Sequence, residues 1–440
     1  MTIRSRGYWI LDSIRGGAVS AEIEEVRRGL QSRPETYAAG RLREQLEAAA
    51  RTVPLYKKFQ GATDLAEFPV MNKGEVSGSY DLTIADGVDR TSVHIASTSG
   101  STGTPFKVLH DGAKRRRAQA DAIYWGQVAG YELGEPLAYI KVWSGHNRVG
   151  PVTRIMRNVF PIDATSLEGG ELLRQIERAG RRGPLSIVAY ASSLEALAKT
   201  LDGRAARGFS AEELPRVTSI ISQSESLEIE VRESLATHFG IVPVSRYGLE
   251  ELGIVAQQQI GGGEEYRINS ASHFVEVLKL DEDKPAVPGE LGRIVVTDLV
   301  NRAQPLIRYD TGDLGVAKLD REGRVDPRYL ARIQGRRQDR IFDTADRPLA
   351  PQVMAGIWWR YPEIRQYQLV QQGKGDYLIR LNIGTRSMET GSIVADFKKV
   401  VGRGASVKVE VTDEELVFSS GKRKRVVNLY TPPTPYETGA

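Results

Sequence analysis

The residues best suited to chemistry form a short run of glycine and hydroxyl side chains. Residues 97–105 read Ser-Thr-Ser-Gly-Ser-Thr-Gly-Thr-Pro and follow an apolar segment with strand character. Glycine lets the backbone turn tightly, so that backbone N–H groups and hydroxyl groups can surround phosphate oxygens. The run is neither a Walker A loop nor a G-x-G-x-x-G dinucleotide fingerprint, because the required residues are missing. A flexible surface loop is the alternative interpretation.

The elements around this run indicate an α/β fold. From about residue 92, short runs rich in β-branched residues alternate with polar helical stretches, and several runs are apolar on both faces. This pattern is typical of buried strands in helix-covered, mostly parallel sheets. The predicted strands are 92–96, 138–143, 186–190, 217–221 and 241–244, with helices at 171–179, 194–201 and 227–238 and a β-rich section with strands at 289–298 and 305–310.

The two ends of the chain differ from this middle part. The first 60 residues read as helical, with an apolar stripe that ends at Pro54. After Gly335 a charge-dense stretch leads into about 100 residues of α+β pattern, enough for a small core of their own. We therefore predict a large domain at residues 1–337 and a small domain at 338–440. The stripe is Leu42, Leu46, Ala49, Ala50 and Val53, and the C-terminal elements are helices at 350–360 and 393–401 and strands at 377–382 and 407–411.

Composition narrows the class of protein. The 440 residues are 40% hydrophobic and 26% charged, which is ordinary for a globular protein and excludes a mainly disordered chain. No run of about 18 apolar residues occurs, so no membrane span is expected. Cysteine is absent, which excludes thiolate nucleophiles and cysteine–zinc sites and favours a reducing cytoplasm. The net charge of +4 suits anionic small molecules and does not by itself indicate a nucleic-acid partner.

The glycine-rich run resembles the phosphate loop of the adenylate-forming enzymes. This superfamily includes acyl-CoA ligases, nonribosomal adenylation domains and luciferases, and four further segments match its motifs in its order. The resemblance implies a large α/β domain and a small α+β domain that rotates about a hinge. It also implies that ATP phosphates are bound by Thr98, Ser99, Gly100, Ser101, Thr102, Gly103 and Thr104.

Two of these segments supply carboxylates. Residues 247–251 (Tyr-Gly-Leu-Glu-Glu) resemble the motif Y-G-x-[ST]-E, which implies that Tyr247 and Gly248 lie at the nucleotide and that Glu251 is a catalytic residue that holds Mg²⁺. Glu250 replaces the usual small hydroxyl residue. Residues 308–313 resemble Y-R-T-G-D, which implies that Asp313 accepts hydrogen bonds from both ribose hydroxyls. Taken alone, the two segments would be a strand end entering a helix and a plain turn.

Two later segments resemble the hinge and the catalytic lysine. Residues 335–341 are similar to the G-R-x-D hinge, which implies that Arg336 lies near the nucleotide and that Gln338 and Asp339 form the hinge. Gln338 stands where the family has an acid. Residues 419–422 resemble the C-terminal S-G-K segment, in which Lys422 would bridge the reacting carboxylate and the phosphates. A charged surface turn and a solvated basic face at 422–425 are the alternatives.

Other landmarks indicate the phenylacetate–coenzyme A ligase-like branch, with its capsule-biosynthesis-related members. They are residues 52–59, 68–73, 289–299 and 305–309. Some relatives have a cysteine cluster that cannot exist here, so no structural zinc is expected. Glu225 corresponds to a family acid beside the adenine, although a helix N-terminal acid is an equal interpretation. The predicted acid pocket, suited to a planar or aryl acid, consists of Trp143, His146, Tyr190 and Ser222.

The resemblance implies an ATP- and Mg²⁺-dependent ligase. A carboxylic acid would be converted to an acyl-adenylate with release of pyrophosphate, and the acyl group would pass to coenzyme A. An amine acceptor is the alternative. A non-catalytic nucleotide-binding scaffold stays open because Glu250 and Gln338 depart from the motifs, and nucleic-acid binding rests only on residues 422–425. The expected partners are small molecules, without nucleic acid or membrane, and a homodimer is an expectation at the level of the family alone.

Overall fold

The structure is a computed structural model of the 440-residue chain. It describes residues 2–430 except 33, 99–105, 142, 144–149, 165–168, 210–212, 225–226, 337–340, 350–356, 359, 362, 365, 384–387, 414–415 and 417–425. Within this part of the chain, no helix is both long and apolar enough to span a bilayer.

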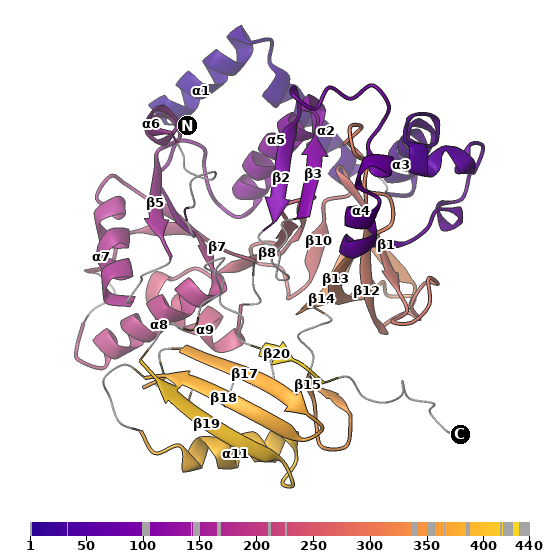
Figure 1. The fold of residues 1–440 in the computed structure, drawn as a ribbon. Coiled ribbons are helices and arrows are strands. Elements are labelled where there is room, and N and C mark those ends of the chain that lie inside the picture. Colours follow the sequence, from indigo (N-terminus) through magenta and orange to yellow (C-terminus); the bar gives the residue numbers. More distant parts are fainter. Residues whose placement is uncertain are drawn as a thin grey trace.

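Helices form the N-terminal part and alternate with strands in the middle of the chain (Figure 1). Of the predicted apolar stripe, Leu46, Ala49 and Ala50 are buried in the third helix and Leu42 is partly buried. The helix ends at Thr52, and Val53 is buried just beyond it, before Pro54. In chain order the helices are α1 (Ile3–Ile14), α2 (Ala18–Gln31), α3 (Pro34–Thr52), α4 (Lys73–Gly78), α5 (Gly112–Val128), α6 (Pro151–Arg157), α7 (Gly169–Gly180), α8 (Ala191–Ala205), α9 (Ile229–Phe239) and α11 (Gly391–Val401).

One large mixed sheet carries most of the strands. Its order is β11-β12-β13-β14-β10-β9-β8-β7-β6-β4-β5, with β1 beside β13. The strands from β5 to β8 run parallel, and those from β8 to β11 pair antiparallel. The strands are β1 (Met71–Asn72), β4 (Leu137–Lys141), β5 (Val159–Asp163), β6 (Leu185–Tyr190), β7 (Val217–Gln223), β8 (Val244–Leu249), β9 (Gly253–Gln257), β10 (Tyr266–Ile268), β11 (His273–Leu278), β12 (Leu291–Asp298), β13 (Tyr309–Leu319) and β14 (Val325–Arg336).

The two halves of this sheet are covered differently. Helices α7, α8 and α9 pack on one face of the parallel half, where they share a core with Ala138, Ile187 and Ile220. A separate hairpin of β2 (His94–Thr98) and β3 (Phe106–His110) packs on the antiparallel half, where Phe106 and Val108 join the core around Tyr309. The predicted α/β fold, with helix-covered parallel strands and a β-rich section, is therefore confirmed.

Several predicted strand starts differ from those in the structure. The strand expected at 241–244 begins only at Val244, because Gly240 ends α9 in the left-handed conformation (φ 71°) and Pro243 has no N–H to donate to the sheet. The strand expected at 305–310 begins only at Tyr309, since Arg308 is itself left-handed with φ 46°. The strand expected at 92–96 lies two residues later, at β2.

The C-terminal residues form their own sheet with order β19-β18-β17-β20, and Figure 1 shows it grouped with α11 apart from the large sheet. Its core contains Trp358, Tyr377 and Phe397. The strands predicted at 377–382 and 407–411 and the helix at 393–401 are confirmed, whereas most of the helix expected at 350–360 lies outside the described residues. The boundary at 337/338 stays a prediction. The strands are β15 (Ile341–Phe342), β16 (Pro348–Leu349), β17 (Gln366–Gly373), β18 (Asp376–Asn382), β19 (Ser406–Thr412) and β20 (Val426–Asn428).

Candidate active site

The segment predicted to bind nucleotide and metal lies in a tight hairpin between β8 and β9. Gly253 adopts φ +86° at the turn, a conformation that favours glycine. A Cβ added to Gly248 would lie 2.9 Å from the carbonyl oxygen of Gly253, so a larger residue would separate the two strands. Glu250 and Glu251 sit at the turn, and the chain continues into a strand rather than a helix.

Gly248→Ala is expected to lower the free energy of unfolding by about 1–3 kcal/mol, because overpacking displaces backbone as well as side chains. Urea unfolding monitored by circular dichroism measures this change. The control is Gly40→Ala in α3, where an added Cβ would meet nothing within 4 Å. That variant should be neutral or more stable by up to about 1 kcal/mol. Wild-type stability in Gly248→Ala would contradict the close approach.

Glu251 is a buried carboxylate held by a buried tyrosine. The hydroxyl of Tyr309 donates a hydrogen bond to Oε1 of Glu251 at 2.7 Å. Burial and the charge of Glu251 raise the pKa of Tyr309, so the phenol keeps the proton that it donates. Tyr309 stacks on Phe106, with ring centroids 5.9 Å apart and planes 4° apart. Phe106 begins β3 directly after residues 99–105, so the residue that follows the glycine-rich run lies against Tyr309.

Asp313 and Tyr247 meet although they are 66 residues apart in the chain. The hydroxyl of Tyr247 donates to Oδ2 of Asp313 at 2.8 Å and lies 3.2 Å from Oγ1 of Thr311. Burial and the nearby carboxylate of Asp313 raise the pKa of Tyr247 well above its usual value. The backbone of Asp313 on β13 lies opposite that of Arg336 on β14 in the strand register. The structure thus brings Tyr247, Glu251 and Asp313 close together, and their roles at a nucleotide site stay a prediction.

The N-terminal landmark lies beside the same place. Strand β1 pairs parallel with the start of β13, with Met71 opposite Tyr309. Arg308 forms a fork with both carboxylate oxygens of Glu276, at 3.2 and 3.0 Å, and donates to the carbonyl of Phe68 at 3.1 Å. Buried charge pairs of this geometry hold their backbone segments firmly, because either charge alone would be costly to bury.

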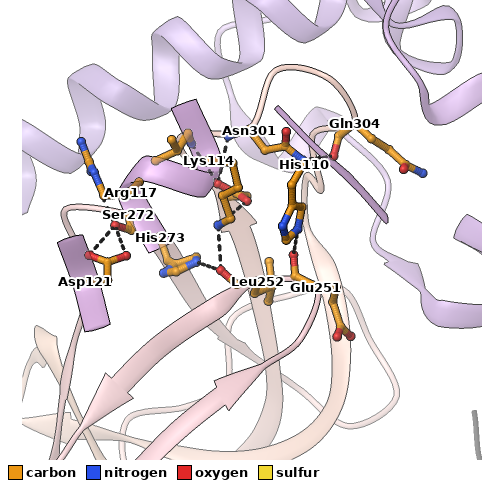
Figure 2. A network of polar contacts seen from close by, with 12 residues as sticks. His110, Lys114, Arg117, Asp121, Glu251, Leu252, Ser272, His273, Asn301 and Gln304 are labelled. Carbon is orange, nitrogen blue, oxygen red and sulfur yellow. Dashed lines mark hydrogen bonds and ion pairs between the residues drawn. The ribbon is translucent and has the colours of Figure 1, made fainter. Parts of the chain in front are cut away.

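A buried network beneath the turn fixes the backbone of Glu251 and Leu252 (Figure 2). Lys114 pairs with Asp298 at 2.7 Å, with both side chains at most 2% exposed, and donates to the carbonyl of Leu252 at 2.7 Å. Nε2 of His273 lies 3.0 Å from the same carbonyl, and Nε2 of His110 lies 2.9 Å from the carbonyl of Glu251. A carbonyl only accepts, so both imidazoles carry their proton on Nε2. The sequence analysis did not predict this network.

Acid is expected to destabilise the protein through His273. Burial, reinforced by Lys114, lowers the pKa of His273 from 6.5 to about 3. Between these values the unfolded chain binds a proton that the folded chain excludes, so stability is full above pH 6.5 and falls as the pH falls, by up to about 1.4 kcal/mol per unit. Urea unfolding at pH 7, 6 and 5 should show a smaller slope in His273→Gln. The exposed-site control His94→Gln should keep the wild-type slope, and an unchanged slope in His273→Gln would contradict the assignment.

Three predicted acid-pocket residues, Trp143, Tyr190 and Ser222, lie at or just beyond the carboxyl ends of parallel strands. Trp143 contacts Tyr139 edge to face at 5.4 Å and donates to the carbonyl of Ile162 at 3.0 Å. Tyr190 ends β6 opposite Gln223. Ser222 is fully buried on the opposite side of β7 from Gln223, the side on which Ile220 joins the helix-covered core. Its place in a pocket stays a prediction.

Several predicted site residues lie outside the described part of the chain. Thr98 is the last residue of β2 and Arg336 the last of β14, and their backbones alone are described. The residues outside are Ser99, Gly100, Ser101, Thr102, Gly103, Thr104, His146, Glu225, Gln338, Asp339 and Lys422.

Comparison with known proteins agrees with these motifs. No family model matches the sequence. The chain is 26% identical over 340 residues to a phenylacetate–coenzyme A ligase of Thermus thermophilus, covering 72% of this chain and 71% of the relative. It is 22% identical over 440 residues to the enzyme of the same name from Aromatoleum evansii, covering 92% and 97%. The chain is thus similar in sequence to phenylacetate–coenzyme A ligases over most of its length.

Solved structures of adenylate-forming enzymes share the fold. A 2-hydroxyisobutyryl-CoA ligase in the postadenylation state, in complex with 2-HIB-AMP, superposes with a TM-score of 0.64 at 17% identity, covering 89% of this chain and 88% of that one. An anthranilate CoA ligase in complex with anthranoyl-AMP superposes with a TM-score of 0.54 at 15% identity, covering 90% and 80%. The predicted resemblance to this superfamily and branch is confirmed.

Proposed function

We propose that this relative of phenylacetate–coenzyme A ligases is an acid–coenzyme A ligase that works through an acyl-adenylate. The observation that carries the proposal is the convergence of Tyr247, Glu251 and Asp313 next to the strand that follows residues 99–105. The relatives named phenylacetate–coenzyme A ligase and the structures with bound acyl-AMP support the same reaction class.

In the first step a carboxylate oxygen of the acid attacks the α-phosphorus of ATP, and the bond to pyrophosphate breaks. Asp313 accepts hydrogen bonds from the ribose hydroxyls, and the hydroxyl of Tyr247 orients its carboxylate. In the second step the thiol sulfur of coenzyme A attacks the acyl carbon, AMP leaves with the bridging oxygen, and the thiol proton is released. Catalysis then rests on positioning and charge stabilisation, without a protein nucleophile.

The residues present fit a magnesium ion at Glu251. Its side chain is 5% exposed, and one oxygen is occupied by the Tyr309 hydroxyl. No ion pair to Glu251 and no cluster of three metal-binding side chains occur among the described residues. A site of one carboxylate completed by substrate phosphates suits Mg²⁺. When bound, the ion offsets the charge that builds up on the phosphate oxygens.

An aryl acid is the substrate class that we propose. Tyr139, Trp143 and Tyr190 supply aromatic surface at the strand ends where the acid would lie. Aromatic rings bind planar ligands through offset or edge-to-face contacts, as the pair of Tyr139 and Trp143 already illustrates.

Pyrophosphate release with a panel of aryl and alkyl acids, with and without coenzyme A, tests the proposal. Release that requires both ATP and one acid, and rises with coenzyme A, is the expected result. Release that does not change with coenzyme A would indicate that the acyl acceptor is an amine or a carrier and not coenzyme A. Bound ATP without release from any acid would overturn the ligase in favour of a scaffold.

A further inference from the structure

A cationic side chain that the proposed reaction does not use lies at the end of β8. Arg246 immediately precedes Tyr247, and neighbouring residues of a strand point to opposite sides. Tyr247 faces Asp313 and the proposed nucleotide site. Arg246 therefore faces the other side, and Gln223 is its partner in the strand pairing. Partners directly opposite each other share a face of the sheet.

That face is the one that carries the aromatic residues. Gln223 donates from Nε2 to the hydroxyl of Tyr139 at 3.4 Å, and Tyr190 is the partner of Gln223 on the next strand. Tyr139 in turn contacts Trp143. The guanidinium of Arg246 thus shares its surroundings with two of the residues predicted to line the acid pocket.

The guanidinium is oriented, and no carboxylate among the described residues neutralises it. Nε donates to Oε1 of Gln257 at 2.7 Å, and Gln257 is itself fixed through a hydrogen bond from Nε2 to the carbonyl of Trp125 at 2.8 Å. Nη2 of Arg246 is buried and has no hydrogen-bond partner among the described residues, and no carboxylate in that part of the chain forms an ion pair with it. Burial lowers the pKa of Arg246 to about 10, as expected for a guanidinium without a counter-ion.

A buried, unpaired cation is expensive unless a ligand supplies the opposite charge. Gln257 fixes Nε of Arg246, and Nη2 has no partner among the described residues. Such a guanidinium suits a carboxylate better than a hydroxyl, because a planar guanidinium can bind both oxygens of a carboxylate in one plane. Lys141 lies nearby, 4.5 Å from the ring centroid of Trp143, but Asp163 stands opposite it in the strand pairing.

We propose that Arg246 binds a second carboxylate of the acid substrate, so that the protein activates acids that carry one carboxylate at the reacting end and another at the far end. This inference rests on the proposed function and names its substrate class more narrowly. A ring that bears two carboxylates fits both the aromatic side chains and the free guanidinium edge.

Matched acid pairs test this assignment. Pyrophosphate release is measured with isophthalate and terephthalate against benzoate, and with glutarate against butyrate. For the wild type, kcat/KM is expected to be at least about 10-fold higher for the better dicarboxylate than for its partner. Arg246→Met should lower that value by about 10- to 100-fold, the scale of one charge-assisted hydrogen-bonded pair. The loss should appear as a higher KM for the dicarboxylate. The kcat/KM for monocarboxylates and the KM for ATP should change less than about 3-fold, within the range of near-neutral contacts.

Two further variants separate binding from a structural role. Arg246→Lys should recover part of the preference for dicarboxylates, since it restores the charge without the fork. Arg267→Met removes an arginine of β10 that donates to the carbonyl of Leu30, and it should leave the preference unchanged. An equal loss with every acid in Arg246→Met, or a wild-type preference for monocarboxylates, would overturn the inference and leave the ligase function standing.

If no acid supports turnover, the proposed function fails and binding still tests Arg246. Isophthalate and terephthalate at millimolar concentration should raise the melting temperature of the wild type and not that of Arg246→Met, because a ligand that binds only the folded state stabilises it. The absence of any shift in the wild type would overturn the inference as well.

Discussion

Replacing Glu251 with glutamine is expected to lower ATP-dependent pyrophosphate release by about 10²- to 10³-fold, the scale of losing one oriented electrostatic group. The amide oxygen of glutamine can still accept the hydrogen bond from Tyr309 that Oε1 accepts now. The geometry of the turn is therefore retained, and the negative charge is what disappears. A magnesium ligand is lost, so the variant should also need more Mg²⁺ for half-maximal rate.

A magnesium titration at saturating ATP and acid measures both effects. The control is Glu264→Gln, which makes the same change of charge at an exposed residue between β9 and β10. It should behave as the wild type. If Glu251→Gln lost activity without any change in its magnesium requirement, Glu251 would be a positioning residue and not a metal ligand.

Lys422→Ala should slow formation of the acyl-adenylate by at least about 10²-fold. Negative charge grows on both the attacking carboxylate and the phosphates, and an ammonium group between them stabilises both. Hydroxylamine trapping of the adenylate isolates this step. Reaction of a preformed acyl-adenylate with coenzyme A should remain within a few-fold of the wild type, because the proposed role of Lys422 ends when pyrophosphate leaves.

Lys424→Ala is the matched control for this lysine. It removes the same charge two residues away in the run Lys-Arg-Lys-Arg at 422–425. A similar loss in both variants would mean that the run acts through its overall charge, and near-normal adenylation in Lys422→Ala would remove the lysine from the mechanism.

The sequence predicted the fold and the residues of the candidate site better than the contacts that hold those residues in place. Tyr247 and Asp313 were recognised because each belongs to a local pattern, and the hydrogen bond between them follows once the fold is known. Tyr309 lies inside a recognised motif, yet its bond to Glu251 depends on how β13 packs against the β8–β9 turn. No local sequence pattern predicts such a contact.

The buried network was beyond sequence reasoning for a different reason. Lys114 belongs to a polar stretch of α5 and reads as a solvated lysine, but the structure pairs it with Asp298 in the core. Arg246 was likewise missed, because the proposal depends on a buried Nη2 that has no hydrogen-bond partner among the described residues. Charged residues are rarely buried, so their burial is learned only from tertiary structure.

The pairing of β1 with β13 also bears on the order in which the protein becomes active. Phe68 and Arg308, which join these segments, are separated by 240 residues. Contacts between such distant segments form late, because the entropy of closing the long intervening loop must first be offset. During synthesis the glycine-rich run and Tyr247 leave the ribosome well before Tyr309 and Asp313 do. A nascent chain therefore carries only part of the proposed ATP site while the 66 residues from Tyr247 to Asp313 are being synthesised. In refolding we expect nucleotide binding to return after the helices have formed.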